Sequence, residues 1–534
     1  MWLRNLLFIG LVVAAIAALR ANLFPLSGNA QVRPVAPVTR GSELDEVIGR
    51  VNAAFRAEWT AQSLQHAPLA DEYTIIRRLS LALTGTIPSW EEMRQLEAIP
   101  PENRVDSWLS YLLHDRRFGN YFAERLARAY VGTEDGPFII YRRRRFVTWL
   151  SEQLLTNRPY GSLVAELIVS DGLWTDKPAT NFITVTTVPE GDGPDQERLA
   201  GRVARAFLGV RLDCAQCHNH PFEEWQQKDF HGLAAFFGKT QQGLTGLYEG
   251  KGEHMMTDHK TAKKETIEPA VPFLKELLPT DGSRRSRLAR WVTHPQNEYF
   301  ARATVQRVWA LLFGRPYLDS VESMDALSNP PQPLVLLAQD FAAHHHDLQR
   351  LIRIITASEV FWQDSKANHE LTDEHERHWA AFPLVRLRPE QVVGSVQQAA
   401  ALKTINAESN LLVRATYQGS INEFVKRYGD TGEDEFTGRG GTIPQRLLLL
   451  NGDMVKESTE NKPFNASTLI ANLSANDRAA VETAYLSVLT RRPTAEEAAH
   501  FESRLAGSKG QERISRLEDL FWTLINSTEF SWNH

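Results

Sequence analysis

The chain has 534 residues, of which 43% are hydrophobic and 23% charged, a composition typical of a soluble globular protein with several domains. Its 59 lysines and arginines against 65 aspartates and glutamates give a formal net charge of −6. This mild negative charge argues against nucleic acid as the main partner, because phosphate backbones attract strongly basic surfaces.

The N-terminus carries an uninterrupted apolar run from Leu6 to Leu19, between Arg4 and Arg20. These 14 residues are fewer than the roughly 20 of a membrane-spanning helix and fit the core of a signal peptide. Gly28–Ala30 then supplies small residues for cleavage. If the apolar segment instead continues to Phe24, Arg20 lies at the membrane interface and the segment is an uncleaved signal anchor. Both alternatives predict an exported protein, periplasmic or anchored in the membrane and facing the periplasm.

The rest of the chain is predicted to be mainly α-helical, with two helical domains and little or no β-sheet. Apolar residues recur with the helical period in these segments: 104–113, 197–208, 301–313, 334–344, 348–355, 389–402 and 514–525. Ser89 is predicted as an N-cap, and Thr494 with Glu497 as a capping box. Only residues 181–188 are predicted as a strand, because they are rich in β-branched side chains.

Changes in composition divide the chain into four parts. The predicted parts are an export segment with its linker, a helical domain, a long loop or connection without a sustained period, and a helical C-terminal domain. Their limits are 1–41, 42–238, 239–282 and 283–534.

The only two cysteines of the chain lie three positions apart, followed by a histidine: Cys214-Ala-Gln-Cys217-His218. The CxxCH pattern is typical of covalent c-type haem attachment, in which the thiols form thioethers and the histidine binds the iron. A disulfide here would close a very short loop and contribute little stability. We therefore predict an exported electron-transfer protein with haem c, which exchanges electrons with a partner protein.

A second axial ligand of the iron is expected shortly after the motif. A methionine would give a His/Met iron of raised potential, and a histidine would give a bis-histidine iron. The candidates are Met255, Met256, His231, His254 and His259.

Two alternatives to haem remain open for the motif. Thiolates with His218 and His220 could bind Zn²⁺ or Cu, or the cysteines could form a dithiol or disulfide. The protein would then be a metal-stabilised or disulfide-bearing cell-surface module that acts as a binding scaffold and lacks haem. HExxH and GxSxG motifs are absent, which argues against a metalloprotease and against a serine hydrolase of the α/β type. Whether the protein is an enzyme is left open.

Five strings along the chain resemble a known pair of domains. They are 206–222, which includes CAQCHNHPF, then 229–237, 299–315, 448–452 and the closing LINSTEFSWNH of 524–534. Together they resemble planctomycete-type exported proteins built from two domains of unknown function, families 1549 and 1553. The first family is nicknamed for a cytochrome c resemblance. The resemblance extends over nearly everything from Glu43 onward and implies export and this order of domains.

Overall fold

The computed structural model describes residues 34–133, 141–187, 193–219, 225–257, 263–322, 330–406, 409, 424–425, 427–428, 436, 442–462 and 465–534. Helices dominate this part of the chain, and its sheets are three antiparallel pairs of short strands. The prediction of a mainly α fold with little β-sheet is confirmed. The N-terminal apolar run lies outside the described ranges. Within them, no helix has both the length and the apolar character to cross a bilayer.

The α-helices that the structure describes up to residue 237 include those that flank the CxxCH motif, α10 and α11. They are α2 (Ser42–Ala61), α3 (Glu72–Thr84), α4 (Trp90–Glu97), α5 (Pro101–Leu113), α6 (Arg116–Val131), α7 (Arg143–Leu155), α8 (Tyr160–Val169), α9 (Asn181–Thr184), α10 (Gln196–Val203) and α11 (Gln227–Ala234). Shorter helical turns are η1 (Pro178–Thr180), η2 (Ala204–Leu208), η3 (Asp213–Gln216) and η4 (Ala235–Phe237).

The remaining helices follow the hairpin segment. They are α12 (Arg284–Val292), α13 (Glu298–Phe313), α14 (Gln332–Ala343), α15 (Leu348–Ala357), α16 (Glu359–Trp362), α17 (Asp373–Arg377), α18 (Pro389–Ala399), α20 (Ile443–Asn451), α21 (Asp453–Thr459), α22 (Ala466–Leu473), α23 (Asp477–Leu489), α24 (Ala495–Leu505), α25 (Gly510–Ile525) and α26 (Thr528–Ser531). A further short turn, η5, spans Lys275–Leu277.

Two hairpins occupy the segment that was predicted as a long connection. Strand β1 (Thr240–Gly243) pairs with β2 (Gly246–Glu249), and β3 (His254–Thr257) pairs with β4 (Lys264–Ile267). The third pair joins distant parts of the chain, because β5 (Val385–Arg386) pairs with β6 (Trp532–Asn533). The segment 239–282 thus contains regular structure that its composition did not reveal.

The prediction of a strand at residues 181–188 is wrong, because Asn181–Thr184 form the helical turn α9. All four residues are buried, so each β-branched side chain packs without a sheet. The Asn181 side chain accepts a hydrogen bond from the backbone N–H of Arg142 (2.7 Å) and donates to the carbonyl of Pro178 (2.8 Å). Tertiary packing here outweighs the local β preference of the sequence.

The predicted helix starts are confirmed. Ser89 forms a capping box with Glu92 at the start of α4, and Thr494 forms one with Glu497 at the start of α24. In each box the hydroxyl accepts from the backbone of the third helical residue, whose carboxylate accepts from the capping residue.

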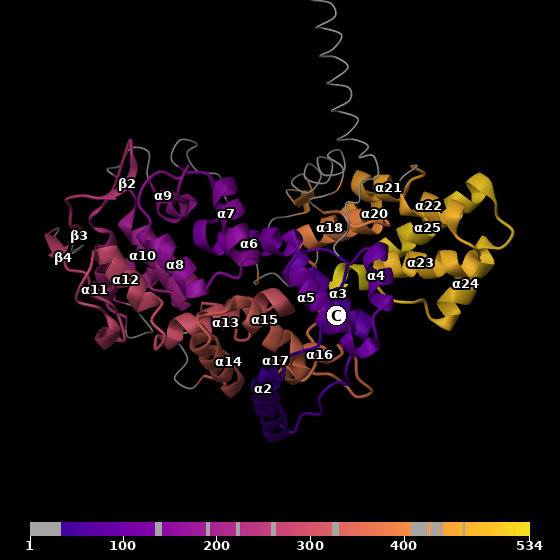
Figure 1. The fold of residues 1–534 in the computed structure, drawn as a ribbon, viewed down its shortest axis with the longest axis horizontal. Helices are drawn as coiled ribbons and strands as arrows, with labels where there is room; N and C mark the ends of the chain where they lie inside the picture. The colour runs from indigo at the N-terminus through magenta and orange to yellow at the C-terminus, as the bar shows by residue number, and fades with distance from the viewer. Residues whose placement is uncertain are drawn as a thin grey trace, which may run out of the picture.

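Helix α3 lies at the centre of the molecule and contributes to two hydrophobic cores. Ile76 belongs to the larger core, formed mainly by residues 35–382, whereas Leu81 belongs to the second core, formed mainly by residues 387–530. In Figure 1, α3 to α5 lie between the α8–α12 part and the α20–α25 part, and the C-terminus returns beside α3. Helices on both sides of residues 239–282 therefore share one core.

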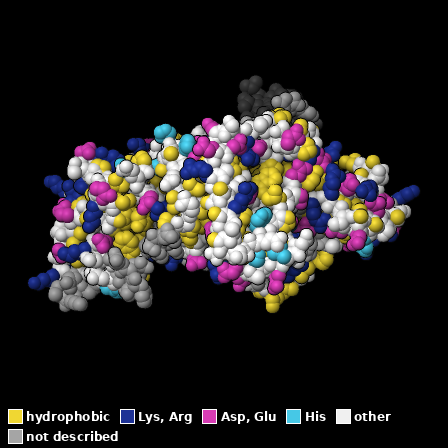
Figure 2. Space-filling model, turned by 90° about the horizontal axis from the view of Figure 1, so that it is seen from below, with side chains coloured by type: hydrophobic (Ala, Val, Ile, Leu, Met, Phe, Trp, Pro, Cys, Tyr) yellow, Lys and Arg dark blue, Asp and Glu magenta, His cyan; other side chains and the backbone are white. Residues whose placement is uncertain are grey.

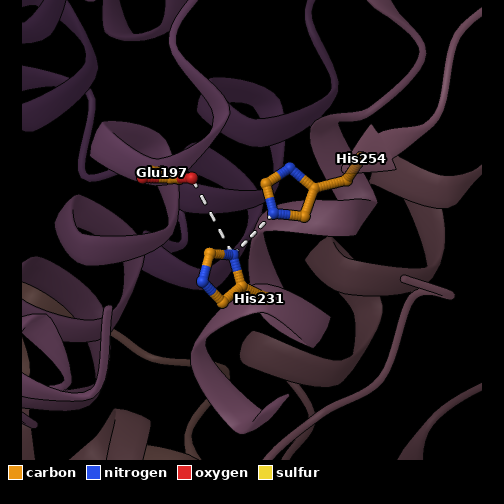
Figure 3. A group of neighbouring side chains, drawn as sticks. All are labelled: Glu197, His231 and His254. Carbon is orange, nitrogen blue, oxygen red and sulfur yellow. Dashed lines mark hydrogen bonds and ion pairs between the residues drawn. The ribbon is translucent and has the colours of Figure 1, made fainter. Parts of the chain in front are cut away.

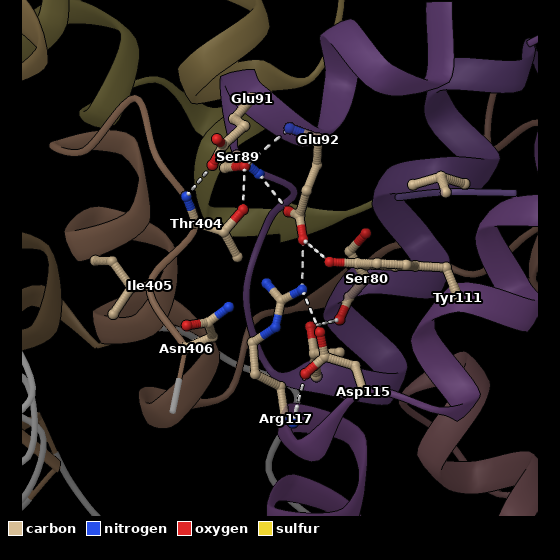
Figure 4. Close-up of polar contacts among 12 residues, drawn as sticks. Ser80, Ser89, Glu91, Glu92, Tyr111, Asp115, Arg117, Thr404, Ile405 and Asn406 are labelled. Carbon is tan, nitrogen blue, oxygen red and sulfur yellow. Dashed lines mark hydrogen bonds and ion pairs between the residues drawn. The ribbon is translucent and has the colours of Figure 1, made fainter. Parts of the chain in front are cut away.

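A buried polar cluster ties α4 to the residues that follow α18 (Figure 4). Glu92 is fully buried, and its carboxylate accepts from the backbone N–H of Ser89 (2.9 Å), the hydroxyl of Tyr111 (3.2 Å) and the guanidinium of Arg117. The Ser89 hydroxyl lies 2.8 Å from the hydroxyl of Thr404. Because every oxygen of this carboxylate has a donor, the buried charge is compensated.

The surface is mixed in charge. Figure 2 shows lysines and arginines interspersed with aspartates and glutamates on the face seen from below, with hydrophobic areas between them. This pattern agrees with the small net charge of −6.

A buried histidine follows α14. The ring of His346 packs against Phe300 and Phe341, with centroid separations of 5.0 and 5.1 Å. Its backbone is in the left-handed region at φ 58°. Burial, and then the charge of neighbouring His345, lower the pKa of His346 to about 4.

Acidification is expected to destabilise the protein through His346. Its pKa is lower in the folded chain than the ordinary value of 6.5, so the unfolded state binds more protons between pH 6.5 and 4. Above pH 6.5 the ring is neutral in both states, and His346 does not reduce the stability. As the pH falls, the free energy of unfolding decreases by up to about 3 kcal/mol near pH 4. The variant His346→Asn tolerates the left-handed backbone and does not titrate in this range. Its urea-unfolding free energy should depend less on pH than that of the parent, and parallel pH curves would contradict the assignment.

Candidate functional site

The CxxCH motif follows the helix that was predicted at residues 197–208. Helix α10 continues as the π-helical turn η2, which ends at Gly209 in the left-handed region at φ 65°. Single π-turns of this kind are frequent at functional sites. The chain then forms the turn η3, which carries Cys214. A Cβ atom on Gly201 of α10 would lie 2.8 Å from a carboxylate oxygen of Asp213, so glycine allows η3 to pack on α10.

The motif presents its reactive side chains to solvent. Cys214 and Cys217 are both exposed and are not joined to each other. His218 is exposed, and its Nδ1 lies 2.7 Å from the carbonyl oxygen of Asn219. Since a carbonyl only accepts, Nδ1 carries the proton and Nε2 of the neutral ring carries the lone pair. His220, the predicted fourth ligand of a metal, lies outside the described residues.

A group of three potential metal ligands lies beside the motif (Figure 3). Glu197 comes from the first turn of α10, His231 from α11 and His254 from β3. Nδ1 of His231 lies 2.8 Å from Nε2 of His254 and 3.8 Å from a carboxylate oxygen of Glu197. One ligand atom from each of the three residues lies within 4.8 Å of the others. Both histidines are buried, and Glu197 is half-buried.

Two glutamines form hydrogen bonds with the three side chains, on atoms that face away from the centre of the group. The carbonyl oxygen of Gln216 lies 3.1 Å from Nε2 of His231, and the amide of the same residue donates to Glu197 at 2.5 Å. The side-chain oxygen of Gln196 lies 2.7 Å from Nδ1 of His254. Gln216 belongs to the CxxCH sequence, so one residue of the motif contacts both His231 and Glu197.

The surroundings favour the neutral form of His254. Burial, and then the charge of His231, lower the pKa of His254 to about 4, while Asp195 acts in the opposite direction. A neutral imidazole keeps a lone pair for a cation, as metal ligation requires.

The two methionines predicted as ligands lie on opposite faces of β3. Met256 is buried against Ala235 and Ile267, whereas Met255 on the same strand is exposed. The sulfur of Met255 accepts a hydrogen bond from the hydroxyl of Thr266 at 3.2 Å. His259 lies outside the described part of the chain. Of the predicted candidates, the structure thus brings His231 and His254 into contact.

Glu197 was not among the predicted site residues. Its position in the first turn of α10 is common for an acidic residue that stabilises a helix N-terminus, so the local pattern carries no signal of metal binding. Its relation to His231 and His254 arises only from the packing of α10 against α11 and from the hairpin β3–β4.

Comparisons with known families agree with the resemblance noted in the sequence. Residues 50–242 match the family described as protein of unknown function DUF1549 (PSCyt2), and residues 284–505 match the one described as protein of unknown function DUF1553 (PSD1). Comparison with curated proteins and with solved structures gave no match. The two matches, which follow one another along the chain, identify it as a protein with a DUF1549 domain followed by a DUF1553 domain.

Proposed function

We propose that the protein is an exported electron-transfer protein that carries a c-type haem attached to Cys214 and Cys217, with His218 as an axial ligand. The observation that carries the proposal is the state of the motif. Both cysteines are exposed and not bonded to each other, and the Nδ1 proton of His218 is directed to the Asn219 carbonyl. The lone pair of Nε2 is therefore available to a metal.

The accessible thiols suit the covalent step. Each thiol adds across one vinyl double bond of the porphyrin: a sulfur–carbon bond forms, and the thiol hydrogen ends on the other vinyl carbon. No oxidant or reductant is consumed, but the two sulfurs must be reduced. Free Cys214 and Cys217 meet this requirement, whereas a disulfide would block it.

A protein partner and export of the chain complete the proposed function. A bound haem exchanges single electrons, and the partner is a redox protein that approaches the exposed motif. The apolar N-terminal segment exports the chain, and it also anchors the protein in the membrane if it is not cleaved. The mild net charge of −6 supports a protein partner rather than nucleic acid.

Haem attachment can be tested directly because the chain has only two cysteines. The full chain, produced in a bacterium with a cytochrome c maturation system, is expected to be red and to retain haem on a denaturing gel. The variant Cys214→Ser/Cys217→Ser should lose all covalent haem, since serine does not form the thioether. Haem staining and the intact mass of the protein measure the result.

A second variant separates attachment from ligation. His218→Ala keeps both thiols, so it should retain covalent haem but show an altered absorption spectrum, because the iron loses an axial ligand. The matched control His114→Ala changes an exposed histidine far from the motif in sequence and should leave the spectrum unchanged. A parent protein without haem, whose cysteines are free thiols or a disulfide, would refute the proposal.

A further inference from the structure

The outer hydrogen bonds of His231 and His254 fix where their protons lie. Nε2 of His231 faces the backbone carbonyl of Gln216 at 3.1 Å, which only accepts, so this nitrogen carries the proton. Nδ1 of His254 faces the side-chain oxygen of Gln196 at 2.7 Å and is protonated for the same reason. In the neutral rings, the inner nitrogens therefore carry lone pairs.

These lone pairs converge with a negative charge. The two inner nitrogens lie 2.8 Å apart, and one oxygen of Glu197 lies 3.8 Å from Nδ1 of His231. The other oxygen of Glu197 is held by the amide of Gln216, which turns the first toward the histidines (Figure 3). Two facing lone pairs and a carboxylate repel one another unless a proton or a metal cation lies between them.

We propose that Glu197, His231 and His254 form a binding site for a divalent transition-metal ion, with Zn²⁺ as its expected occupant. Two imidazoles and one carboxylate are a donor set that Zn²⁺ accepts with a fourth position open to water or another ligand. Metal–nitrogen bonds of about 2.0–2.1 Å at a tetrahedral angle separate the nitrogens by about 3.3 Å. The rings would move apart by only about 0.5 Å from their present 2.8 Å.

Each ligand already has the outer partner that metal sites require. In metal sites, ligating histidines donate their second N–H to a carbonyl or carboxylate, which fixes the orientation of the ring. Here Gln216 and Gln196 supply these acceptors, and Gln216 also orients Glu197. The site uses neither cysteine and does not depend on haem.

Zinc binding can be measured without interference from the motif. The full chain with Cys214→Ser and Cys217→Ser has no thiolate and no covalent haem, so neither contributes to its metal uptake, and the ligand variants below assign the binding that remains. After removal of metals by a chelator, this background is expected to bind one equivalent of Zn²⁺ in calorimetry and to gain thermal stability on binding.

Three variants in the same background test the ligands and their outer partner. His254→Gln and Glu197→Gln should each weaken Zn²⁺ binding by more than about 100-fold, and Gln196→Ala should weaken it by about 10- to 100-fold because a supporting partner is lost. The matched controls His500→Gln and Glu496→Gln change exposed residues of α24 and should bind as the background does.

Folding of the variants is checked apart from binding. Circular dichroism and metal-free thermal unfolding show whether each variant retains the fold of the background. Failure of the background to bind Zn²⁺, or equal binding by folded His254→Gln, would overturn the proposal and assign the pair to an ordinary hydrogen bond. Neither outcome affects the haem proposal, which rests on the cysteines.

Discussion

Replacement of Arg117 by methionine is expected to lower the free energy of unfolding by about 3–5 kcal/mol. Arg117 contacts the carboxylate of Glu92, which is fully buried, and also pairs with Asp115 at 2.9 Å. Burial disfavours the guanidinium charge, but Glu92 and Asp115 outweigh this effect and raise the pKa of Arg117 well above its usual value. Without the arginine, Glu92 retains a buried charge that loses its positive partner.

Equilibrium unfolding in urea measures this loss, and two further variants define its origin. The double variant Glu92→Gln/Arg117→Met removes both charges and should recover part of the stability. Arg94→Met, on the same helix as Glu92, breaks an ion pair with Glu97 in which the arginine side chain is 60% exposed. It should cost less than about 1 kcal/mol. An Arg117→Met cost as small as that of Arg94→Met would contradict the prediction.

Replacement of Arg78 by methionine is expected to cost at least about 3 kcal/mol. Arg78 is fully buried in α3 and donates to the carbonyls of Phe361 and Gln363, both at 2.8 Å, and of His534 at 2.7 Å. Its guanidinium also lies 3.5 Å from the centre of the Phe382 ring. Methionine fills much of the volume but leaves the buried carbonyls of Phe361 and Gln363, and the half-buried main-chain oxygen of His534, without these donors.

Lysine at position 78 distinguishes geometry from charge. Arg78→Lys keeps a positive charge but cannot reproduce the planar stack or all three bonds, so its unfolding free energy should lie between those of the parent and Arg78→Met. Equal stability of the parent and Arg78→Met in urea unfolding would contradict the role assigned to these contacts.

Helices were predictable where one face is consistently apolar. In α25, the residues that give the predicted segment 514–525 its apolar face are all buried: Ile514, Leu517, Leu520, Phe521, Leu524 and Ile525. Helix starts were predictable because capping depends on residues three positions apart. The turn α9 was not predictable, since its β-branched residues favour a strand locally and the contacts that override this preference come from Arg142 and Pro178.

The candidate sites divide in the same way. The CxxCH motif is local, so its residues were identified from their spacing alone. The group of Glu197, His231 and His254 is formed by the start of α10, by α11 and by strand β3. The sequence around β3 does not show the alternation of apolar and polar residues that would predict a strand. The histidines were predicted as possible ligands, but their contact with each other and with Glu197 depends on tertiary packing. A single sequence carries no local pattern for such packing.

The central position of α3 also affects how the chain reaches its folded state. The hydrogen bond between Arg78 and the carbonyl of His534 closes a loop of 456 residues, and the bond from Arg77 to the carbonyl of Phe530 closes one of 453. Closure of such long loops has a high entropic cost, and proteins with many distant contacts fold slowly. Both arginines therefore lack these partners until the last helices dock. We expect a late, slow refolding phase in which the second core joins α3.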